Sequence, residues 1–328
     1  MSKTIYFCDR PTKVALVEIK DLSAEKRQAI RDLHRVEDWR NVRALLFFAI
    51  YAAGAWAAWM ADHLIIQVIG SLGIVCAMVG LTVLLHEASH GLLLKRPVLN
   101  DLLGFLCGLP VLLPVSAFRT NHKGHHARRS SRATPDDVAF PRLEKARSGL
   151  GYFLAFLAKA FAFITVLPAS SVIKADWKTR FQTISEYSFV ITVYALLFRF
   201  FPFAGMWKLW LLPLLIGAFL TQVRAIAEHG LTTRGNVFTA TRTVVSNRVV
   251  SFMMCNINYH LEHHLFPGVP WYNLPKVHEL LQDECRRAGS STYRSYTEFF
   301  LDFFKAISAG LIPNARLLSV DARRALSH

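Results

Sequence analysis

The chain has 328 residues, of which 53% are hydrophobic, and its mean hydropathy is positive at +0.30. This composition is too apolar for a soluble domain of such length, so it indicates several membrane segments in one embedded domain. The formal net charge of +15 comes from basic residues interleaved with long apolar runs. It therefore favours a negatively charged bilayer surface as the partner and argues against nucleic acid.

Residues 1–41 are polar and of mixed charge, and they contain no apolar core followed by a cleavage site of small residues. They predict a cytoplasmic N-terminal segment without a signal peptide. We expect a membrane domain over residues 42–285 and a cytoplasmic C-terminal tail over residues 286–328. The 5 cysteines lack CxxC spacing, which argues against a disulfide framework or an iron–sulfur cluster.

Apolar stretches of about 20 residues, the length that crosses the hydrocarbon core, recur along the chain. They are residues 42–60, 64–85, 150–170, 187–205 and 208–225. The stretch 102–118 is also apolar, but it carries glycine and proline residues that predict a re-entrant or interfacial segment.

Lys and Arg are frequent in residues 1–43, 119–147 and 224–328, whereas the short loops 61–63 and 203–207 have none. The positive-inside rule then places the termini in the cytoplasm and both loops outside. A fifth crossing would separate the basic regions, so we interpret 150–170 as a helix in the cytoplasmic interface. The expected fold is all-α, with four transmembrane helices in two hairpins under a cytoplasmic helical cap.

Most of the 13 histidines fall in short groups: His86 and His90 in HEASH, His122, His125 and His126 in HKGHH, His229 in AEHG, and His260, His263 and His264 in HLEHH. Residues three or four apart share a helix face, so each motif should direct all or most of its imidazoles toward a common point. These nine histidines exceed the ligands of one ion, so two metal ions are expected. An imidazole shell without cysteine favours iron, which can activate dioxygen.

Carboxylates near the motifs are candidates for orienting the imidazoles and balancing the metal charge. They are Glu87, Glu228, Glu262, Asp136 and Asp137. The isolated histidines His34, His63, His278 and His328 are expected to be structural.

At these residues the chain resembles the membrane fatty-acid desaturase and hydroxylase superfamily, whose hallmark is three histidine boxes. The boxes stand here as HEASHG, NHKGHH and NYHLEHHLFPGVPWYNLP, and the resemblance covers roughly residues 40–285. It implies a cytoplasm-facing site with two Fe²⁺ ions, dioxygen as the oxidant, external electrons, and the nine histidines of the motifs as ligands. Some relatives have an asparagine where this chain has Ala225, which leaves a tenth ligand open, with Asn258 as a candidate.

The resemblance predicts an oxidoreductase that introduces a carbon–carbon double bond into a fatty acyl chain. Alternatives are a hydroxylase or ketolase on the same scaffold, a desaturase of a small amino-acid-derived metabolite, and, more distantly, a metal transporter. The sequence contains no fused cytochrome b5 or ferredoxin module, so we expect a separate electron donor of either type with its reductase. Arg128, Arg129 and Arg132 are suited to an acidic carrier or to lipid. In a bacterium the location would be the inner membrane.

Overall fold

The computed structural model describes residues 19–130, 151, 153–154, 167–230, 232 and 237–308, with side chains of 124–130 and 307 outside the description. Its helices on the N-terminal side are η1 (Ile19–Asp21), α1 (Ala24–Asp32), η2 (Asp38–Val42), α2 (Arg43–Met60), α3 (Leu64–Ser89), α4 (Pro97–Gly108), η3 (Leu109–Val111) and α5 (Val115–Ser130). After residue 176 come α7 (Trp177–Phe200), α8 (Phe203–Met206), the π-helical segment η5 (Trp207–Leu211) and α9 (Leu212–His229). The remaining elements are β1 (Thr243–Val244), α10 (Arg248–Met253), α11 (His260–Leu265), η6 (Trp271–Asn273), α12 (Leu274–Ala288), β2 (Thr292–Tyr293) and α13 (Tyr296–Ser308).

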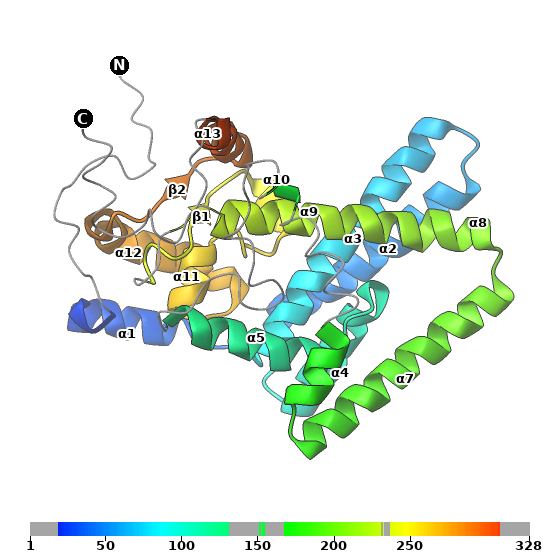
Figure 1. Ribbon diagram of the computed structural model, residues 1–328, viewed down its shortest axis with the longest axis horizontal. Coiled ribbons are helices and arrows are strands. Elements are labelled where there is room, and N and C mark those ends of the chain that lie inside the picture. Colours follow the sequence, from blue (N-terminus) through cyan, green and yellow to red (C-terminus); the bar gives the residue numbers. More distant parts are fainter. Residues whose placement is uncertain are drawn as a thin grey trace.

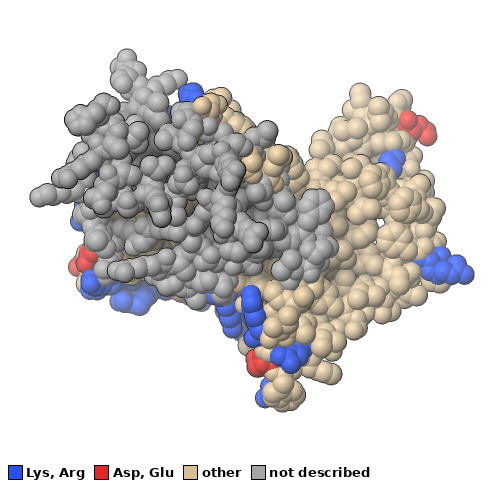
Figure 2. Space-filling model, in the orientation of Figure 1, with Lys and Arg blue, Asp and Glu red and all other residues tan. Residues whose placement is uncertain are grey.

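Within the described ranges, 4 helical stretches are long and apolar enough to cross a membrane: Asp38–Met60, Leu64–Ser89, Trp177–Phe200 and Phe203–His229. Helices α2 and α3 pack side by side as one hairpin, whereas α7 and α9, joined through α8, diverge from each other and α9 packs against α3 (Figure 1). The smaller helices from α10 to α13 gather at one end of the spans. The expected all-helical fold with four spans is confirmed. Figure 2 shows that the part occupied by the spans carries few charged side chains, as a surface in contact with lipid requires.

The first hairpin is held together by close backbone contact between α2 and α3. A Cβ atom on Gly70 would lie 2.6 Å from the carbonyl oxygen of Gly54 and 2.7 Å from the nitrogen of Ala58. Small residues at such crossings allow membrane helices to approach closely and gain van der Waals contact. This packing fixes α3, whose last turns carry HEASH.

The boundaries predicted for the second hairpin, 187–205 and 208–225, are wrong. Helix α7 begins ten residues earlier, because Asp176 caps it by accepting hydrogen bonds from the N–H groups of Lys178 and Thr179, both at 3.0 Å. Its first turns are polar, so hydropathy alone does not identify this start. The turn falls at Phe201 and Pro202, since proline cannot continue the first helix but readily starts the next.

Proline also distorts the last span, but the carbonyl oxygen that it frees is hydrogen-bonded by a side chain. Pro213 lacks the N–H that would bond the carbonyl oxygen of Leu209, and the helix has the π-helical segment η5 just before it. The Tyr51 hydroxyl donates to this Leu209 oxygen at 3.1 Å. Within a bilayer such a bond replaces one that water cannot supply.

The expected re-entrant segment 102–118 corresponds to α4 and η3 followed by α5, two stretches that meet at an angle of 96°. Carbonyl oxygens of η3, next to the bend, are satisfied by side chains: Tyr194 donates to the Leu109 oxygen at 3.1 Å and Trp210 donates to the Pro110 oxygen at 2.9 Å. Such a break is tolerated at membrane depth where protein covers it. The interpretation of 150–170 as an interfacial helix falls largely outside the described residues.

The parity of the spans gives a labelling prediction. Asp62, between α2 and α3, and Lys174, just before α7, are exposed and lie at opposite ends of the hairpins. In a variant whose native cysteines are replaced by alanine, Asp62→Cys and Lys174→Cys should react with an impermeant thiol reagent from opposite sides of the membrane. Reaction of both from the same side would contradict the four-span arrangement.

Candidate metal centre

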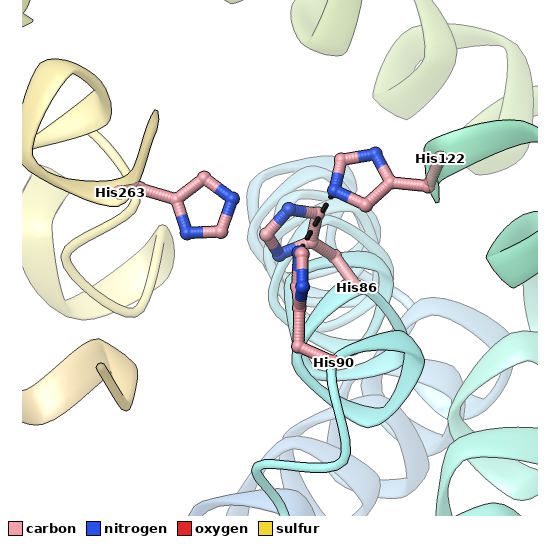
Figure 3. Close-up of side chains that lie close together, drawn as sticks. All are labelled: His86, His90, His122 and His263. Carbon is pink, nitrogen blue, oxygen red and sulfur yellow. Dashed lines mark hydrogen bonds between the residues drawn. The ribbon is translucent and has the colours of Figure 1, made fainter. Parts of the chain in front are cut away.

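Four histidines from three helices converge at the end of the first hairpin (Figure 3). His86 lies on the last turn of α3 and His90 caps the C-terminal end of that helix, His122 comes from α5, and His263 comes from α11. One ring nitrogen from each lies within 4.8 Å of the others. His90 and His122 are closest, with their Nε2 atoms 2.9 Å apart. We call these residues the first group.

Three more histidines form a second group at the end of the last span. His229 ends α9, and His260 and His264 lie one turn apart on α11. Their ligand nitrogens also lie within 4.8 Å of one another, with Nε2 separations of 2.9 Å from His229 to His260 and 3.1 Å from His260 to His264. The final turn of one span and a short cap helix thus build this group together.

Helix α11 serves both groups: most of the imidazoles of its motif share one group, as expected, and His263 joins the other. Successive residues in an α-helix point about 100° apart, so His263 faces away from its neighbour His264 while His260 and His264 nearly align. His263 therefore joins the first group and the other two join the second. The ring centroids of His263 and His264 are only 5.6 Å apart, so the two groups are adjacent.

The described part of the chain does not reach every predicted ligand. His125 and His126 lie on α5, but their side chains are outside the description, as are Asp136 and Asp137. His122, one turn before them, points into the first group.

Glu87 is fully buried beside the first group. Its Oε1 lies 3.3 Å from Nδ1 of His86, and its Oε2 accepts a hydrogen bond of 3.0 Å from the backbone N–H of Trp271. The indole N–H of Trp271 donates to Asn41 at 3.1 Å. The segment LFPGVPWYNLP thus folds back to hold the carboxylate that faces the first histidine box.

Glu228 has the corresponding position beside the second group. It is buried, its Oε1 accepts a 2.7 Å hydrogen bond from Arg224, and its Oε2 lies 3.6 Å from Nε2 of His260. The carbonyl oxygens that end α9 are also engaged: Arg242 donates to Ala227 at 2.9 Å. Each group therefore has one buried carboxylate next to a predicted ligand, as charge balance requires.

Glu262, which is part of α11, connects this helix to β1 and α12. It is fully buried, and its oxygens accept hydrogen bonds from the hydroxyl of Thr243 and from Nδ1 of His278, the latter at 2.6 Å. Burial by itself lowers the pKa of His278, but the hydrogen bond and negative charge of Glu262 outweigh burial and raise the pKa above its usual value. His278 and the buried carboxyl group of Glu262 thus form a close pair.

His278 is thus a residue that sequence reasoning set aside as structural in isolation, although it anchors the third box. Its position on α12, one turn after LFPGVPWYNLP, gave no sign of this contact, because only the fold brings α12 against α11. Asn258 has a supporting role in the fold as well: its Nδ2 donates to the carbonyl oxygens of Val244 at 2.8 Å and Val245 at 3.0 Å.

Arg119 ties the second box to the first. It lies on α5 one turn before His122, pairs with Asp101, and donates to the α3 carbonyl oxygens of Ala88 at 3.0 Å and Ser89 at 3.2 Å. These oxygens belong to the helix end that carries His86 and His90, where the intrahelical bonds run out. One guanidinium therefore fixes the distance between two of the elements that form the first group.

The geometry of both groups suits a metal ion. Imidazole nitrogens bound at about 2.1 Å from one ion lie about 3 Å apart when the bond angles are near 90°. The closest Nε2 pairs, at 2.9 Å in the first group and 2.9 and 3.1 Å in the second, match that spacing. The residues present therefore fit two ions, one in each group.

Comparison with known proteins gives the class. The profile of the family "Fatty acid desaturase" matches residues 63–296. The sphingolipid delta(4)-desaturase DES1 of Drosophila melanogaster is 30% identical over 239 residues, which cover 71% of this chain and 70% of that protein. This chain therefore belongs to the fatty acid desaturase family and is a multi-pass membrane oxidoreductase.

More distant relatives include the sn-1 oleoyl-lipid 12-desaturase of Arthrospira platensis, 24% identical over 303 residues, which cover 80% of this chain and 85% of the relative. The sn-1 acyl-lipid omega-3 desaturase (ferredoxin) of Nostoc sp. (strain 36) is 24% identical over 225 residues, 60% of this chain and 62% of the relative.

The contact between Glu262 and His278 generates a stability prediction. His278→Ala should lower the free energy of unfolding by about 3 kcal/mol, because it removes one partner of a buried charged pair while Thr243 still donates to Glu262. The midpoint temperature of thermal unfolding in detergent should fall, and the iron content per chain should fall as well. The control is His34→Ala, which removes an exposed histidine whose Nδ1 lies 2.8 Å from the Ile30 carbonyl oxygen, and should cost less than about 1 kcal/mol. Equal losses in both variants would contradict a specific role for His278.

Proposed function

We propose that this chain is an iron- and dioxygen-dependent desaturase that introduces a double bond into a fatty acyl chain. The observation that carries this proposal is the pair of adjacent histidine groups that share α11. We propose His86, His90, His122 and His263 as ligands of one iron and His229, His260 and His264 as ligands of the other. His125 and His126 remain proposed ligands from the motif alone.

Iron is the metal that the donor set favours. Neutral imidazoles dominate both groups, and neither contains a cysteine, which disfavours Cu(I) and iron–sulfur chemistry. When bound, two irons supply the redox chemistry that activates dioxygen and removes hydrogen from an unactivated C–H bond. The donor set thus favours iron, and the presence of two histidine groups is the reason for proposing two ions.

The contribution of the chain's own residues is to hold the ligands in place and to exclude water. His263 is fully buried, and His86, His260 and His264 are nearly so. Glu87 and Glu228 bring a buried carboxyl group to within 3.3 and 3.6 Å of one imidazole in each group. A dry site with fixed ligands lets the position of the bound substrate decide which C–H bond reacts.

A membrane lipid is the proposed source of the acyl chain. The spans expose many large apolar side chains, including Ile69 and Leu72 on α3 and Phe219 on α9, so the hydrocarbon of the bilayer borders the same helices that carry the histidines. The relatives named above act, by their names, on sphingolipid and sn-1 acyl lipids. Membership of this enzyme family removes the support for a metal transporter.

We further propose that the histidine groups and both termini face the cytoplasm and that electrons come from a separate ferredoxin or cytochrome b5 type carrier with its reductase. The name of one relative specifies ferredoxin. The orientation follows from the excess of Lys and Arg on the histidine side of the spans.

The metal content provides the first test. The purified full-length chain should hold about two irons, and either His90→Ala or His264→Ala should reduce this toward one, since each variant removes a ligand of a different group. Mass spectrometry of metals and Mössbauer spectroscopy measure the content and its state. His63→Ala, in the loop between α2 and α3, is the matched control. A single zinc with no iron after growth in iron-replete medium would contradict the di-iron proposal.

The product provides the second test. Expression in a host with a simple lipid profile, together with a ferredoxin and its reductase, should give fatty acids that are two hydrogens lighter, detected by mass spectrometry. His263→Ala should abolish this change because His263 adjoins both groups. Fatty acids one oxygen heavier would favour the hydroxylase alternative. An unchanged lipid profile with iron bound and reductase active would favour a small metabolite as substrate.

A further inference from the structure

A basic surface lies on the histidine side of the first hairpin, around the start of α2. Five exposed residues make it up: Arg35, Arg40, Lys95, Arg96 and Lys276. They come from the segment before α2, the segment after α3 and the first turn of α12. We call these five residues the entry surface.

Two acidic residues within the entry surface show that its parts lie together. The hydrogen bond from Arg40 and, less strongly, the positive charges of Arg35 and Lys276 lower the pKa of Glu37. Asp38 accepts a 3.0 Å hydrogen bond from the backbone N–H of Lys95. The basic residues outnumber these acids, so the surface has a net positive charge and is suited to an acidic partner.

Aromatic side chains lead inward from this surface. Trp39 is 66% exposed, and the guanidinium of Arg40 lies 4.3 Å from its ring centroid and 5.4 Å from that of Tyr272. The Tyr272 hydroxyl accepts a 2.7 Å hydrogen bond from the N–H of Glu37 and donates to the carbonyl oxygen of Arg35 at 3.2 Å. Tyr272 is therefore fixed directly beneath the basic residues.

The same series of contacts continues to the first histidine group. The ring of Tyr272 packs edge-on against buried Trp271, with centroids 5.3 Å apart. The N–H of Trp271 donates to Oε2 of Glu87, whose Oε1 lies 3.3 Å from Nδ1 of His86. Tyr272, Trp271 and Glu87 thus connect an exposed basic surface with the metal centre without a break.

We infer that the entry surface docks an acidic, soluble one-electron carrier protein and that Tyr272, Trp271 and Glu87 connect that carrier to the first histidine group. This inference rests on the proposed function, since it requires iron in that group. In each transfer one electron leaves the carrier, which is oxidised, and reduces the bound iron; no covalent bond forms or breaks. The carrier approaches from water, because the entry surface flanks the ends of α2 and α3 that lead out of the membrane.

Charge reversal tests the docking. In the purified, iron-loaded full-length protein in neutral nanodiscs, the double variant R40E/K276E should slow iron reduction by a reduced [2Fe–2S] ferredoxin about tenfold at low salt, because charges at the rim of an interface control the association rate. Reduction by dithionite should be unchanged. Freeze-quench Mössbauer spectroscopy, which resolves ferric from ferrous iron, follows both reactions.

Arg286→Glu is the matched control, because Arg286 lies on the same helix as Lys276, its side chain is 77% exposed, and its nearest acid, Asp283, is 3.7 Å away. It should leave the ferredoxin rate unchanged. An equal slowing by Arg286→Glu, no slowing by the double variant, or a slowing of dithionite reduction as well would each overturn the inference. So would a defect that appears only in vesicles of anionic lipid, which would identify the surface as a headgroup contact. Absence of iron from the unmodified protein would instead overturn the proposed function, and the inference with it.

Replacement of Tyr272 tests the connection. Tyr272→Phe keeps the ring against Trp271 and should retain the ferredoxin rate within about twofold, whereas Tyr272→Leu should lower it several-fold at saturating ferredoxin. Iron content and dithionite reduction should be the same in both variants. Equal ferredoxin rates for the Phe and Leu variants would show that the ring is not part of the connection.

Discussion

The structure depends on bringing imidazoles from α3, α5, α9 and α11 to within bonding distance of common points where the membrane spans end. Helix ends are poor places for such accuracy, because their last carbonyl groups have no intrahelical partner and tend to fray. Here those groups are bonded by side chains from elsewhere: Arg119 at the end of α3 and Arg242 at the end of α9. Each arginine holds the turn that carries ligands of one group.

The same requirement explains the polar bonds deeper in the spans. Breaks in the helices at Leu109, Pro110 and Pro213 leave carbonyl oxygens that lipid cannot satisfy. Tyr194, Trp210 and Tyr51 bond the freed oxygens. The distorted last span and the bent segment before α5 can therefore take the directions that bring His229 and His122 to their groups.

Much of this arrangement could be predicted from the sequence, because the histidine motifs and apolar runs are local signals. The number of spans and the convergence of HEASH with His122 follow from spacing and parity. Contacts between distant segments could not be predicted: the bond of Glu262 to His278, the return of Trp271 to Glu87, and the division of HLEHH between two groups. The start of α7 was missed because its cap, Asp176, and polar first turns do not resemble a membrane span.

The division of α11 between the groups has a consequence for how electrons and substrate meet. The contacts from the entry surface reach His86 and hence the first group alone, while the second group is built on α9 and the far side of α11. On the proposed function, electrons for a second iron would cross between the groups, and the neighbouring rings of His263 and His264, whose centroids lie 5.6 Å apart, join them. Because Thr243 and His278 both donate hydrogen bonds to Glu262 on α11, this helix holds the two histidine groups at a fixed separation. The third box thus determines the spacing of the two histidine groups, and its support extends to α12 and β1.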